Sequence, residues 1–543
     1  MADGQPSPTR QGRARVPDRA DVVVVGAGFA GMYLIKLLRE AGRDVVALEA
    51  GSSVGGTWYW NRYPGARCDI PSMQYSLSFD KELEQEWTWS ERYSPQAEIL
   101  AYAEHVADRH NVWRDICFDT FVTDAAWDDE GREWTLTTKA GEQIRAPFCI
   151  FATGCLSVPN QTRFPGEDRF KGPVYRTGLW PHEDVRFDGM RVGVIGTGSS
   201  AIQSIPVIAE QAAEMWIFQR TPNYSIPAYN APLQPDEVAA VKADYSGLRA
   251  RQQVAFAAAD FDANPDRVTA DHTPDQRRAE YERRWQIGGL GFLAGYADAM
   301  FDPGANEDAA EFVRGKIREI VQDPETAELL CPSNTIGCKR LCVDTEYFAT
   351  FNRPNVHLVD VSKSPIDEID ETAIHTGGTA YEVDAIVFAI GFDAMTGALT
   401  RVDIKGRNGR SLRDEWQDGP RTYMGLSMAG FPNLFTVTGP GSPSVFTNML
   451  PSIEHHCEWI TQCIAAQPQG GVIEATEEAQ TTWSAHNLDV AGAHLRSSCS
   501  SWYTGENIAG KPKVFMPYIG GFPRYVEFAN KVAADGYRGF AAR

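Results

Sequence analysis

Two glycine-rich segments have the spacing of a turn that holds a phosphate group. The first, Gly26-x-Gly28-x-x-Gly31, follows four consecutive valines and precedes apolar residues at helical spacing. In such a strand-turn-helix unit the first glycine permits a tight turn, the second lets the backbone approach a pyrophosphate, and the third brings the helix against the strand. The next apolar strand ends in Glu49, whose carboxylate can accept hydrogen bonds from a ribose diol. This segment predicts a dinucleotide site without a 2′-phosphate.

The pattern recurs as Gly196-x-Gly198-x-x-Ala201. Here the second strand ends in Arg220 and Thr221 instead of an acid. A cation and a hydroxyl at that position suit a ribose 2′-phosphate, which a carboxylate would repel. Two such sites in one chain indicate electron transfer between a tightly held dinucleotide and an exchanging one, here NADPH. A duplication that left one site inactive is the alternative.

Length and charge limit the classes of protein to which the chain can belong. Its 543 residues suffice for roughly three or four structural units. Acidic residues outnumber basic ones, 72 to 51, and the formal net charge of -21 repels phosphate backbones and anionic membrane surfaces. No apolar run reaches the ~18 residues of a membrane span. We therefore expect neither nucleic acid nor membrane as a partner, and a monomer or weak oligomer.

The cysteines and the N-terminal segment give two further expectations. The 10 cysteines are scattered, without a CxxC pair or the spacing of a zinc site, which predicts mostly buried thiols in a reducing compartment and no metal site. The first 18 residues lack the apolar region of a signal peptide. We therefore expect a cytoplasmic location and a disordered tail at residues 1–18.

A third motif stands between the two glycine-rich segments. The sequence GGTWYWNRYPGARCD contains Gly55-Gly56-x-Trp58-x4-Tyr63-Pro64-Gly65-x3-Asp69. This spacing resembles the fingerprint of Baeyer-Villiger monooxygenases, flavoproteins with FAD in the first domain and NADPH in the second. The resemblance extends over about residues 20–530 and is closest to the phenylacetone and steroid monooxygenase branch. Further matching segments are FQRTP at 218–222, GCKRL at 337–341, AGFPNLF at 429–435, GPGSPS at 439–444 and SWYTG at 501–505.

The resemblance implies a chemistry and the residues that perform it. NADPH would reduce FAD, O2 would add to flavin C4a, and the resulting peroxide anion would convert a ketone to an ester or lactone. Arg340 occupies the family's catalytic position and Asp69 that of its carboxylate partner, both beside the cofactors, where a fixed positive charge stabilises the peroxide anion. Lys339 and Arg220 would clamp the 2′-phosphate, and Trp502 would close over the nicotinamide. The other implied cofactor-binding residues are Gly56, Thr57, Trp58, Tyr75, Val122, Gly196, Thr197, Gly198, Ser199, Ser200, Gln203 and Thr221.

The predicted fold class is α/β, with two Rossmann-like dinucleotide-binding domains, for FAD and NADPH, and a helical insertion in the second. Apolar runs that stop at Gly154 and Gly391 mark the points where the chain crosses between domains. After the tail, the predicted segments are 19–157 and 390–543 for the FAD domain, 158–227 and 336–389 for the NADPH domain, 228–335 for the insertion, and a mobile loop near 490–511.

One position departs from the family. The second fingerprint, FxGxxxHxxxWP, stands here as Phe170-x-Gly172-x3-Arg176-x3-Trp180-Pro181, with arginine in place of histidine. Arginine is longer and does not lose its proton, so a role that needs a neutral imidazole is excluded. We expect looser coupling between the domains and more hydrogen peroxide released per NADPH.

Three alternatives stay open at this point. A related flavin monooxygenase could oxidise sulfides or amines through a protonated hydroperoxide, which needs no arginine. A disulfide reductase with two dinucleotides is disfavoured because no CxxC or CxxxxC follows the first glycine-rich segment. A non-catalytic dinucleotide-binding protein is the third, and Arg176 adds weight to it.

Apolar residues at 445, 446, 449 and 450 are expected to line the ketone pocket, without revealing which ketone.

Overall fold

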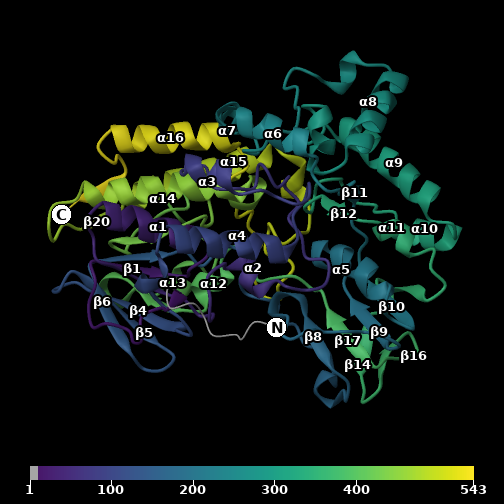
Figure 1. The fold of residues 1–543 in the computed structure, drawn as a ribbon, viewed down its shortest axis with the longest axis horizontal. Coiled ribbons are helices and arrows are strands. Elements are labelled where there is room, and N and C mark those ends of the chain that lie inside the picture. The colour runs from purple at the N-terminus through teal and green to yellow at the C-terminus, as the bar shows by residue number, and fades with distance from the viewer. Residues whose placement is uncertain (1–9, 543) are drawn as a thin grey trace.

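The structure is a computed structural model that describes residues 10–542, and two parallel sheets form its framework (Figure 1). The first sheet has the order β19-β7-β1-β2-β3, and the second has the order β13-β10-β9-β17-β8. In the first sheet these strands are Leu434–Thr436, Phe148–Phe151, Val22–Val25, Val45–Leu48 and Ile116–Cys117. In the second they are Val356–Asp360, Glu214–Gln219, Arg191–Ile195, Ala385–Phe388 and Val174–Arg176.

The first sheet is buried on both faces, as the run of four valines in β1 requires. Val22 and Val24 face a core under helices α1 (Phe29–Glu40), α14 (Met449–Ala465) and α16 (Phe522–Ala534). Val23 and Val25 face the opposite core. That side is covered by the sheet of β18 (Asp403–Lys405), β4 (Val122–Asp128), β5 (Glu133–Thr138) and β6 (Gln143–Ala146).

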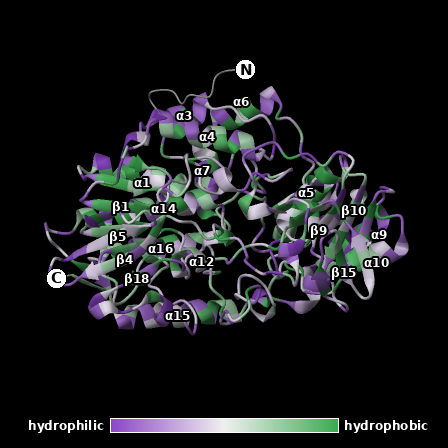
Figure 2. Cartoon of the chain, turned by 90° about the horizontal axis from the view of Figure 1, so that it is seen from below, coloured by the Kyte–Doolittle hydropathy of each residue, from purple (hydrophilic) through white to green (hydrophobic). Residues whose placement is uncertain are grey.

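The second sheet repeats the arrangement with different partners. Val192 and Val194 of β9 pack in the core that holds helix α5 (Ser199–Ala209). Ile195 packs on the opposite side. There the three-stranded sheet of β14 (Ile366–Ile369), β15 (Ala373–Thr376) and β16 (Thr379–Glu382) covers the surface. Figure 2 shows hydrophobic residues gathered on the inner strands of both halves and hydrophilic residues on outer helices such as α3 (Lys81–Glu86).

The segment 228–335 is helical, as predicted, but it does not all belong to the second domain. Its helices are α6 (Pro235–Ala243), α7 (Tyr245–Val254), α8 (Pro274–Ile287), α9 (Pro303–Ile320) and α10 (Pro324–Leu330). Tyr245 and Leu248 of α7 pack in the core of the first domain, whereas Tyr281 and Trp285 of α8 pack in the core of the second. The buried Arg249 ties α7 to the first domain, because its Nε donates to Glu84 at 2.8 Å. The insertion therefore bridges the two domains.

The chain crosses between the sheets near the two predicted glycines. It leaves the first sheet after β7 and returns after β17, each of which hydrogen-bonds to the first strand of its own glycine-rich unit. No helix among residues 10–542 is long and apolar enough to cross a membrane. The remaining elements are α2 (Thr57–Trp60), α4 (Gln96–Arg109), α11 (Tyr347–Thr350), α12 (Gly397–Thr400), α13 (Leu412–Glu415), α15 (Glu477–Gly492), β11 (Ser225–Pro227), β12 (Cys342–Asp344), β20 (Ile473–Ala475) and β21 (Phe540–Ala542).

The N-terminal segment differs from the tail that we expected at residues 1–18. Residues 1–9 lie outside the described residues. From residue 10 onward the chain lies on the first domain, since Arg10 pairs with Glu104 and Asp108, each at 2.7 Å, and Val16 is buried. A single apolar anchor and a few ion pairs order this stretch, which its composition alone did not indicate.

Candidate functional site

The first glycine-rich turn joins β1 to α1 and has two close approaches that exclude larger residues. Gly26 has φ +104°, and a Cβ there would lie 2.7 Å from the carbonyl oxygen of Ala152. A Cβ on Gly31 would lie 2.0 Å from the carbonyl oxygen of Gly26. Gly28 gives α1 no capping side chain, and the first turn of α1 carries no acid. The free amides at the N-terminus of α1 therefore fit a phosphate group.

Glu49 lies at the end of β2, as predicted, beside this turn. Its Oε2 accepts a hydrogen bond from the Ala27 amide at 2.6 Å, and its Oε1 accepts one from the Gly51 amide at 2.8 Å. Burial raises the pKa of the carboxyl, while the bonds from backbone amides of Ala27 and Gly51 act in the opposite direction. The turn and the acid together fit a dinucleotide whose ribose has free hydroxyls.

The fingerprint segment lies between the first turn and the second domain. Gly56 meets the first turn so closely that a Cβ on it would lie 2.9 Å from the Cα of Gly28. At the other end, the Tyr63 hydroxyl donates to Oε1 of Gln203 on α5 at 2.8 Å. Gly65 has φ +77°, and a Cβ there would lie 2.2 Å from the Gln203 carbonyl oxygen. The fingerprint glycines thus let one segment contact both the first turn and helix α5, which follows the second turn.

Gln203 therefore contacts the fingerprint with its side-chain amide. Besides accepting from Tyr63, it donates from Nε2 to the carbonyl oxygen of Arg67 at 3.0 Å. The structure thus places this predicted cofactor-binding residue at the contact between domains. The spacing of the second glycine-rich motif could not reveal this contact, because Tyr63 lies 140 residues from Gln203.

The second turn joins β9 to α5 and resembles the first in its backbone. Gly196 has φ +113°, and a Cβ there would lie 2.4 Å from the carbonyl oxygen of Ala389. Around Gly198, by contrast, a Cβ would meet no atom within 4 Å. Helix α5 begins with Ser199 and Ser200, without a capping side chain or an acid in its first turn. Open space beside free amides fits a second phosphate-bearing ligand.

Positive charge gathers beside this second turn. Arg220 follows β10 and is exposed, and Lys339 approaches it from the segment 337–341. Burial, and then the nearby charge of Arg220, lower the pKa of Lys339. Within residues 10–542 neither cation forms an ion pair. Two cations without an acid fit a phosphate dianion, as the sequence predicts. Thr221 also lies here, and its carbonyl oxygen accepts from the Thr197 hydroxyl at 2.8 Å.

Arg340 and Asp69 form a bidentate ion pair between the two turns. Arg340 Nε lies 2.5 Å from Oδ2 of Asp69, and Nη2 lies 2.7 Å from Oδ1. A third bond runs from Nη1 to the carbonyl oxygen of Val445 at 2.7 Å. Burial acts against the charge of Arg340, but the carboxylate outweighs it, and the pKa of the guanidinium is raised. The site thus holds a fixed positive charge in one orientation.

Two residues near this ion pair were not predicted from the sequence. Tyr503 is buried and its ring packs on Phe446, with ring centroids 4.5 Å apart. Arg496 also packs on Phe446, with its guanidinium 5.1 Å from the ring centroid, and burial lowers the pKa of Arg496. Tyr503 directly follows Trp502 in the SWYTG match, and that adjacency was available in the sequence. Nothing in the sequence indicated Arg496.

The remaining predicted residues lie at three places. Trp58 donates from its indole nitrogen to the Tyr75 hydroxyl at 3.2 Å, so these two pack together beside the first turn, and Thr57 begins α2. Val122 is buried at the start of β4, two residues beyond Thr120, whose amide donates to the Glu49 carbonyl oxygen. Trp502 is half-buried in the cluster of Val445, Phe446 and Tyr503.

The segment that carries Trp502 is docked on the chain crossings. Asn507 Nδ2 donates to the carbonyl oxygen of Phe392 at 2.7 Å, and Lys511 Nζ contacts Oδ1 of Asp393 at 2.6 Å. Asn160, near the outward crossing, donates to the Asn507 carbonyl oxygen at 3.3 Å. The loop therefore contacts both segments that connect the domains.

The expectation of mostly buried thiols is met by most of the cysteines. Eight are free, and all of these except Cys331 are buried. Cys338 and Cys499 form a disulfide across a separation of 161 residues. A pair so far apart in sequence is not detectable from spacing, because only the fold brings it together.

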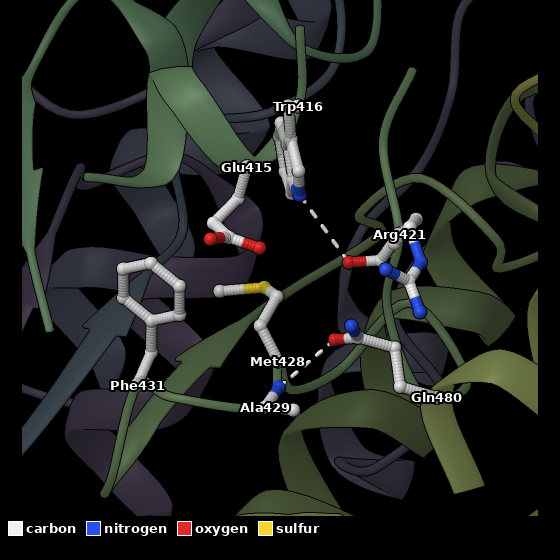
Figure 3. A pocket seen from close by; sticks show the side chains of 7 residues that line it. All are labelled: Glu415, Trp416, Arg421, Met428, Ala429, Phe431 and Gln480. Atoms are coloured by element: carbon white, nitrogen blue, oxygen red, sulfur yellow. Dashed lines mark hydrogen bonds between the residues drawn. The ribbon is translucent and has the colours of Figure 1, made fainter. Parts of the chain in front are cut away.

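A small pocket elsewhere takes no part in this arrangement. Gln480 accepts from the Ala429 amide at 2.9 Å and Trp416 donates to the Arg421 carbonyl oxygen at 3.2 Å across it (Figure 3). Its lining residues are Glu415, Trp416, Arg421, Met428, Ala429, Phe431 and Gln480. None of these is a predicted site residue, so the pocket does not alter the assignment.

Comparison with known proteins places this geometry among flavoprotein oxygenases. A family model described as pyridine nucleotide-disulphide oxidoreductase matches residues 23–276. An acetone monooxygenase (methyl acetate-forming) of Gordonia sp. is 42% identical over 96% of this chain and 98% of its own. A phenazine N-monooxygenase of Lysobacter antibioticus is 39% identical over 96% of both chains. A Baeyer-Villiger monooxygenase of Pseudooceanicola batsensis is 39% identical over 95% of both.

Solved structures agree with this placement. An oxidized steroid monooxygenase bound to NADP is 50% identical and superimposes with a TM-score of 0.92, over 96% of this chain and 99% of that one. OTEMO in complex with FAD and NADP is 36% identical, with a TM-score of 0.93 and the same coverage. The likeness covers nearly the whole chain, so both turns and the segments between them are shared.

Proposed function

The chain belongs to the Baeyer-Villiger monooxygenase family, and we propose that it converts ketones to esters or lactones with O2, using FAD and NADPH. The observation that carries this proposal is the bidentate pair of Arg340 and Asp69 between the two dinucleotide-binding turns. Relatives across the whole chain are named as ketone monooxygenases, and solved relatives hold FAD and NADP.

FAD belongs in the first turn and NADPH in the second. Gly28, the amides of α1 and the carboxylate of Glu49 suit a ribose with two free hydroxyls. Arg220 and Lys339 suit the 2′-phosphate that distinguishes NADPH, because they are the cations of this turn and have no carboxylate partner in the described chain. Thr197 and Ser199 would line the same phosphate path.

Arg340 supplies the fixed charge that the reaction needs. Bound FAD, once reduced by NADPH, supplies the activation of O2. Asp69 holds the guanidinium by two of its nitrogens and the Val445 carbonyl holds the third, so little reorientation is needed when negative charge develops on oxygen. The same charge would orient the nicotinamide end of NADPH during hydride transfer.

The ketone would bind beside this charge, against Val445, Phe446, Met449 and Leu450. Trp502 and its loop would cover the nicotinamide end and exclude water. Contacts of Asn507 and Lys511 with residues 392 and 393 suit a loop that responds to the relative position of the domains. Cytoplasmic location, a monomeric or weakly associated state and the predicted domain bounds are parts of the same proposal.

One relative favours a second candidate function. The phenazine N-monooxygenase shares 39% of its residues with this chain, so oxidation of a nitrogen or sulfur nucleophile is compatible with the fold. That reaction does not require a cation beside the activated oxygen. The Arg340–Asp69 pair therefore favours the ketone reaction.

A product screen separates the two. The holoenzyme is incubated with NADPH, air and matched panels of ketones and sulfides, and the products are identified by gas chromatography. The proposal expects esters or lactones from ketones. Sulfoxides without any ester would overturn it in favour of the second candidate. Loss of flavin absorbance on anaerobic addition of NADPH separates both from a non-catalytic protein.

A further inference from the structure

The disulfide joins two segments that the proposed reaction brings together. Cys338 directly precedes Lys339 and Arg340, and Cys499 lies three residues before Trp502. Their Cα atoms are 5.7 Å apart, a separation that a disulfide spans without backbone movement. The pair therefore links the segment that carries the fixed charge to the base of the loop that carries Trp502.

Among residues 10–542, few other contacts hold the base of this loop, residues 495–499. Arg496 Nε donates to the carbonyl oxygen of Gly337 at 2.7 Å, and the Leu495 amide donates to the carbonyl oxygen of Met300 at 3.0 Å. Arg496 also lies over Phe446. These are single hydrogen bonds and one cation-π contact, each worth about 1 kcal/mol. The covalent bond between Cys338 and Cys499 is stronger than any of these contacts. It therefore determines whether the base of the loop stays attached to the Arg340 segment.

The surroundings of the pair favour thiol chemistry. Cys338 and Cys499 are only 2% and 8% exposed, but they lie next to the segment where the proposed reaction activates oxygen. Arg496 brings its guanidinium close to the pair, because its Nε donates to the carbonyl oxygen of Gly337, next to Cys338, and its own carbonyl oxygen accepts from the Cys499 amide. Positive charges of this kind favour the thiolate, which is the form that reacts with peroxide.

The neighbouring free cysteines, Cys68 and Cys342, also lie near a positive charge, that of Arg340, but burial and the Asp69 carboxylate raise the pKa of both thiols. Cys68 adjoins Asp69, and burial together with that carboxylate raises its thiol pKa. Burial likewise raises the pKa of the Cys342 thiol to about 12. Both are free thiols, without a disulfide bond to a second cysteine among the described residues. A peroxide formed at the site would therefore meet one pair that can close to a disulfide.

We propose that Cys338 and Cys499 are a reversible modification site for hydrogen peroxide, and that their disulfide tethers the Trp502 loop to the Arg340 segment. One thiolate attacks a peroxide oxygen, breaks the O–O bond and becomes a sulfenic acid as hydroxide leaves with a proton as water. The second thiol displaces the sulfenic oxygen as a second water. Two thiols and one H2O2 thus give one disulfide and two waters, and a cellular dithiol reverses the step.

The source of the peroxide rests on the proposed function. When no ketone is present, NADPH, a proton and O2 give NADP+ and H2O2, so the pair would oxidise during idle turnover. Closure of the disulfide would then keep the loop base attached while no substrate is bound. The cysteine chemistry itself does not depend on this source, because added peroxide replaces it.

Thiol counting on the full-length holoenzyme tests the proposal. The reduced protein, freed of reductant and then unfolded, should show 10 reactive thiols, and the protein treated with stoichiometric H2O2 should show 8. Peptide mapping should find the lost pair at Cys338 and Cys499. Cys499→Ser, which can form a sulfenic acid at Cys338 but no disulfide, should lose at most one thiol, whereas Cys331→Ser, the matched control at the half-exposed free cysteine, should still lose two thiols.

A count of ten thiols after peroxide, or a loss that persists unchanged in Cys499→Ser, would overturn the proposal. Because the wild-type comparison needs no variant, a folding defect in Cys499→Ser does not obscure the result. Amide exchange within residues 495–511 should become about tenfold faster on reduction of the wild type and unchanged on reduction of Cys499→Ser. Equal exchange in both wild-type forms would overturn the tether.

A second arm separates failure of this proposal from failure of the proposed function. NADPH and air without ketone should remove the same two thiols as added H2O2. If only added peroxide does so, the cysteine pair is supported and its oxidation during idle turnover is overturned, while ester formation from a ketone reports separately on the proposed function. If the protein forms esters but neither treatment changes the thiol count, the oxygenase function is supported and the cysteine proposal is overturned.

Discussion

The two dinucleotide-binding turns have nearly the same backbone but opposite chemical surroundings. Gly26 and Gly196 both have φ above +100°. Each lies against the carbonyl oxygen of the residue that directly follows a neighbouring strand, Ala152 after β7 and Ala389 after β17. Beside the first, Glu49 is buried and accepts two backbone amides, whereas beside the second, Arg220 and Lys339 have no acidic partner among the described residues. The geometry of each turn therefore determines that a phosphate group binds there. The residues that follow β2 and β10 determine which dinucleotide carries that phosphate.

The largest effect should come from the third position of the turn, which is glycine in the first region and alanine in the second. Gly31 lies against the Gly26 carbonyl oxygen, so Gly31→Val should abolish flavin retention, measured as the absorbance of the purified protein. The second turn already has Ala201 at this position. Ala201→Gly should cost only about 1 kcal/mol of helix stability and leave flavin content unchanged. Flavin retained in full by Gly31→Val would show that the first turn does not bind FAD.

Loss of a cation should affect only the second region. Arg220→Ala removes one charge-assisted contact to the 2′-phosphate, so kcat/KM for NADPH should fall about 10- to 100-fold while that for NADH changes little. Steady-state kinetics with the two nucleotides measure this. An equal fall for both would mean that Arg220 supports the fold and does not select the phosphate.

The lowered pKa of Lys339 should make NADPH use depend on pH. Its charge is needed to bind the phosphate, and burial with Arg220 nearby makes it lose its proton below the ordinary lysine value of 10.5. As pH rises through this lowered pKa, kcat/KM for NADPH should fall more than that for NADH. Lys339→Arg stays charged and should remove the difference. An identical alkaline profile in both proteins would contradict the assignment.

The smallest effect should come from Arg176, which connects the two regions indirectly. Arg176 Nη2 lies 2.5 Å from Glu167, and its guanidinium is 4.4 Å from the ring centroid of Phe388, just before the return crossing. This clamp ties β8 to β17. Arg176→His gives up this clamp but restores the imidazole of the family's fingerprint, so hydrogen peroxide release per NADPH should fall about twofold, or ~0.4 kcal/mol.

A peroxide assay during ketone turnover measures that leak. Arg169→His, which removes the exposed pair of Arg169 with Glu368 in the same domain, is the matched control and should not change it. An unchanged leak in Arg176→His would mean that the substituted fingerprint position does not govern coupling.

Local patterns were enough to predict much of this architecture. A run of valines, a glycine turn and helical spacing specify a strand-turn-helix unit because each interaction lies within about 30 residues. The sequence therefore predicted both sheets' central strands, the helical character of 228–335 and the residue types beside each turn. The Arg340–Asp69 pair was expected only through family resemblance, since 271 residues separate the partners.

Contacts between distant segments were the part that local patterns could not predict. The attachment of α7 to the first domain depends on Arg249 reaching Glu84, 165 residues away. The engagement of Gln203 with Tyr63 and the Cys338–Cys499 bond are of the same kind. Each of these contacts depends on how the domains pack against one another. A short stretch of sequence carries no information about that packing.

Ester formation by Arg340→Ala tests the central claim most directly. The variant should keep its flavin, because Glu49 and the first turn are untouched. Removal of the fixed charge should lower ester formation from a ketone by about 1000-fold. Flavin content by absorbance and ester yield by gas chromatography are measured on the same preparation. A variant that retains FAD and forms ester at nearly the wild-type rate would contradict the claim that Arg340 stabilises the reacting oxygen.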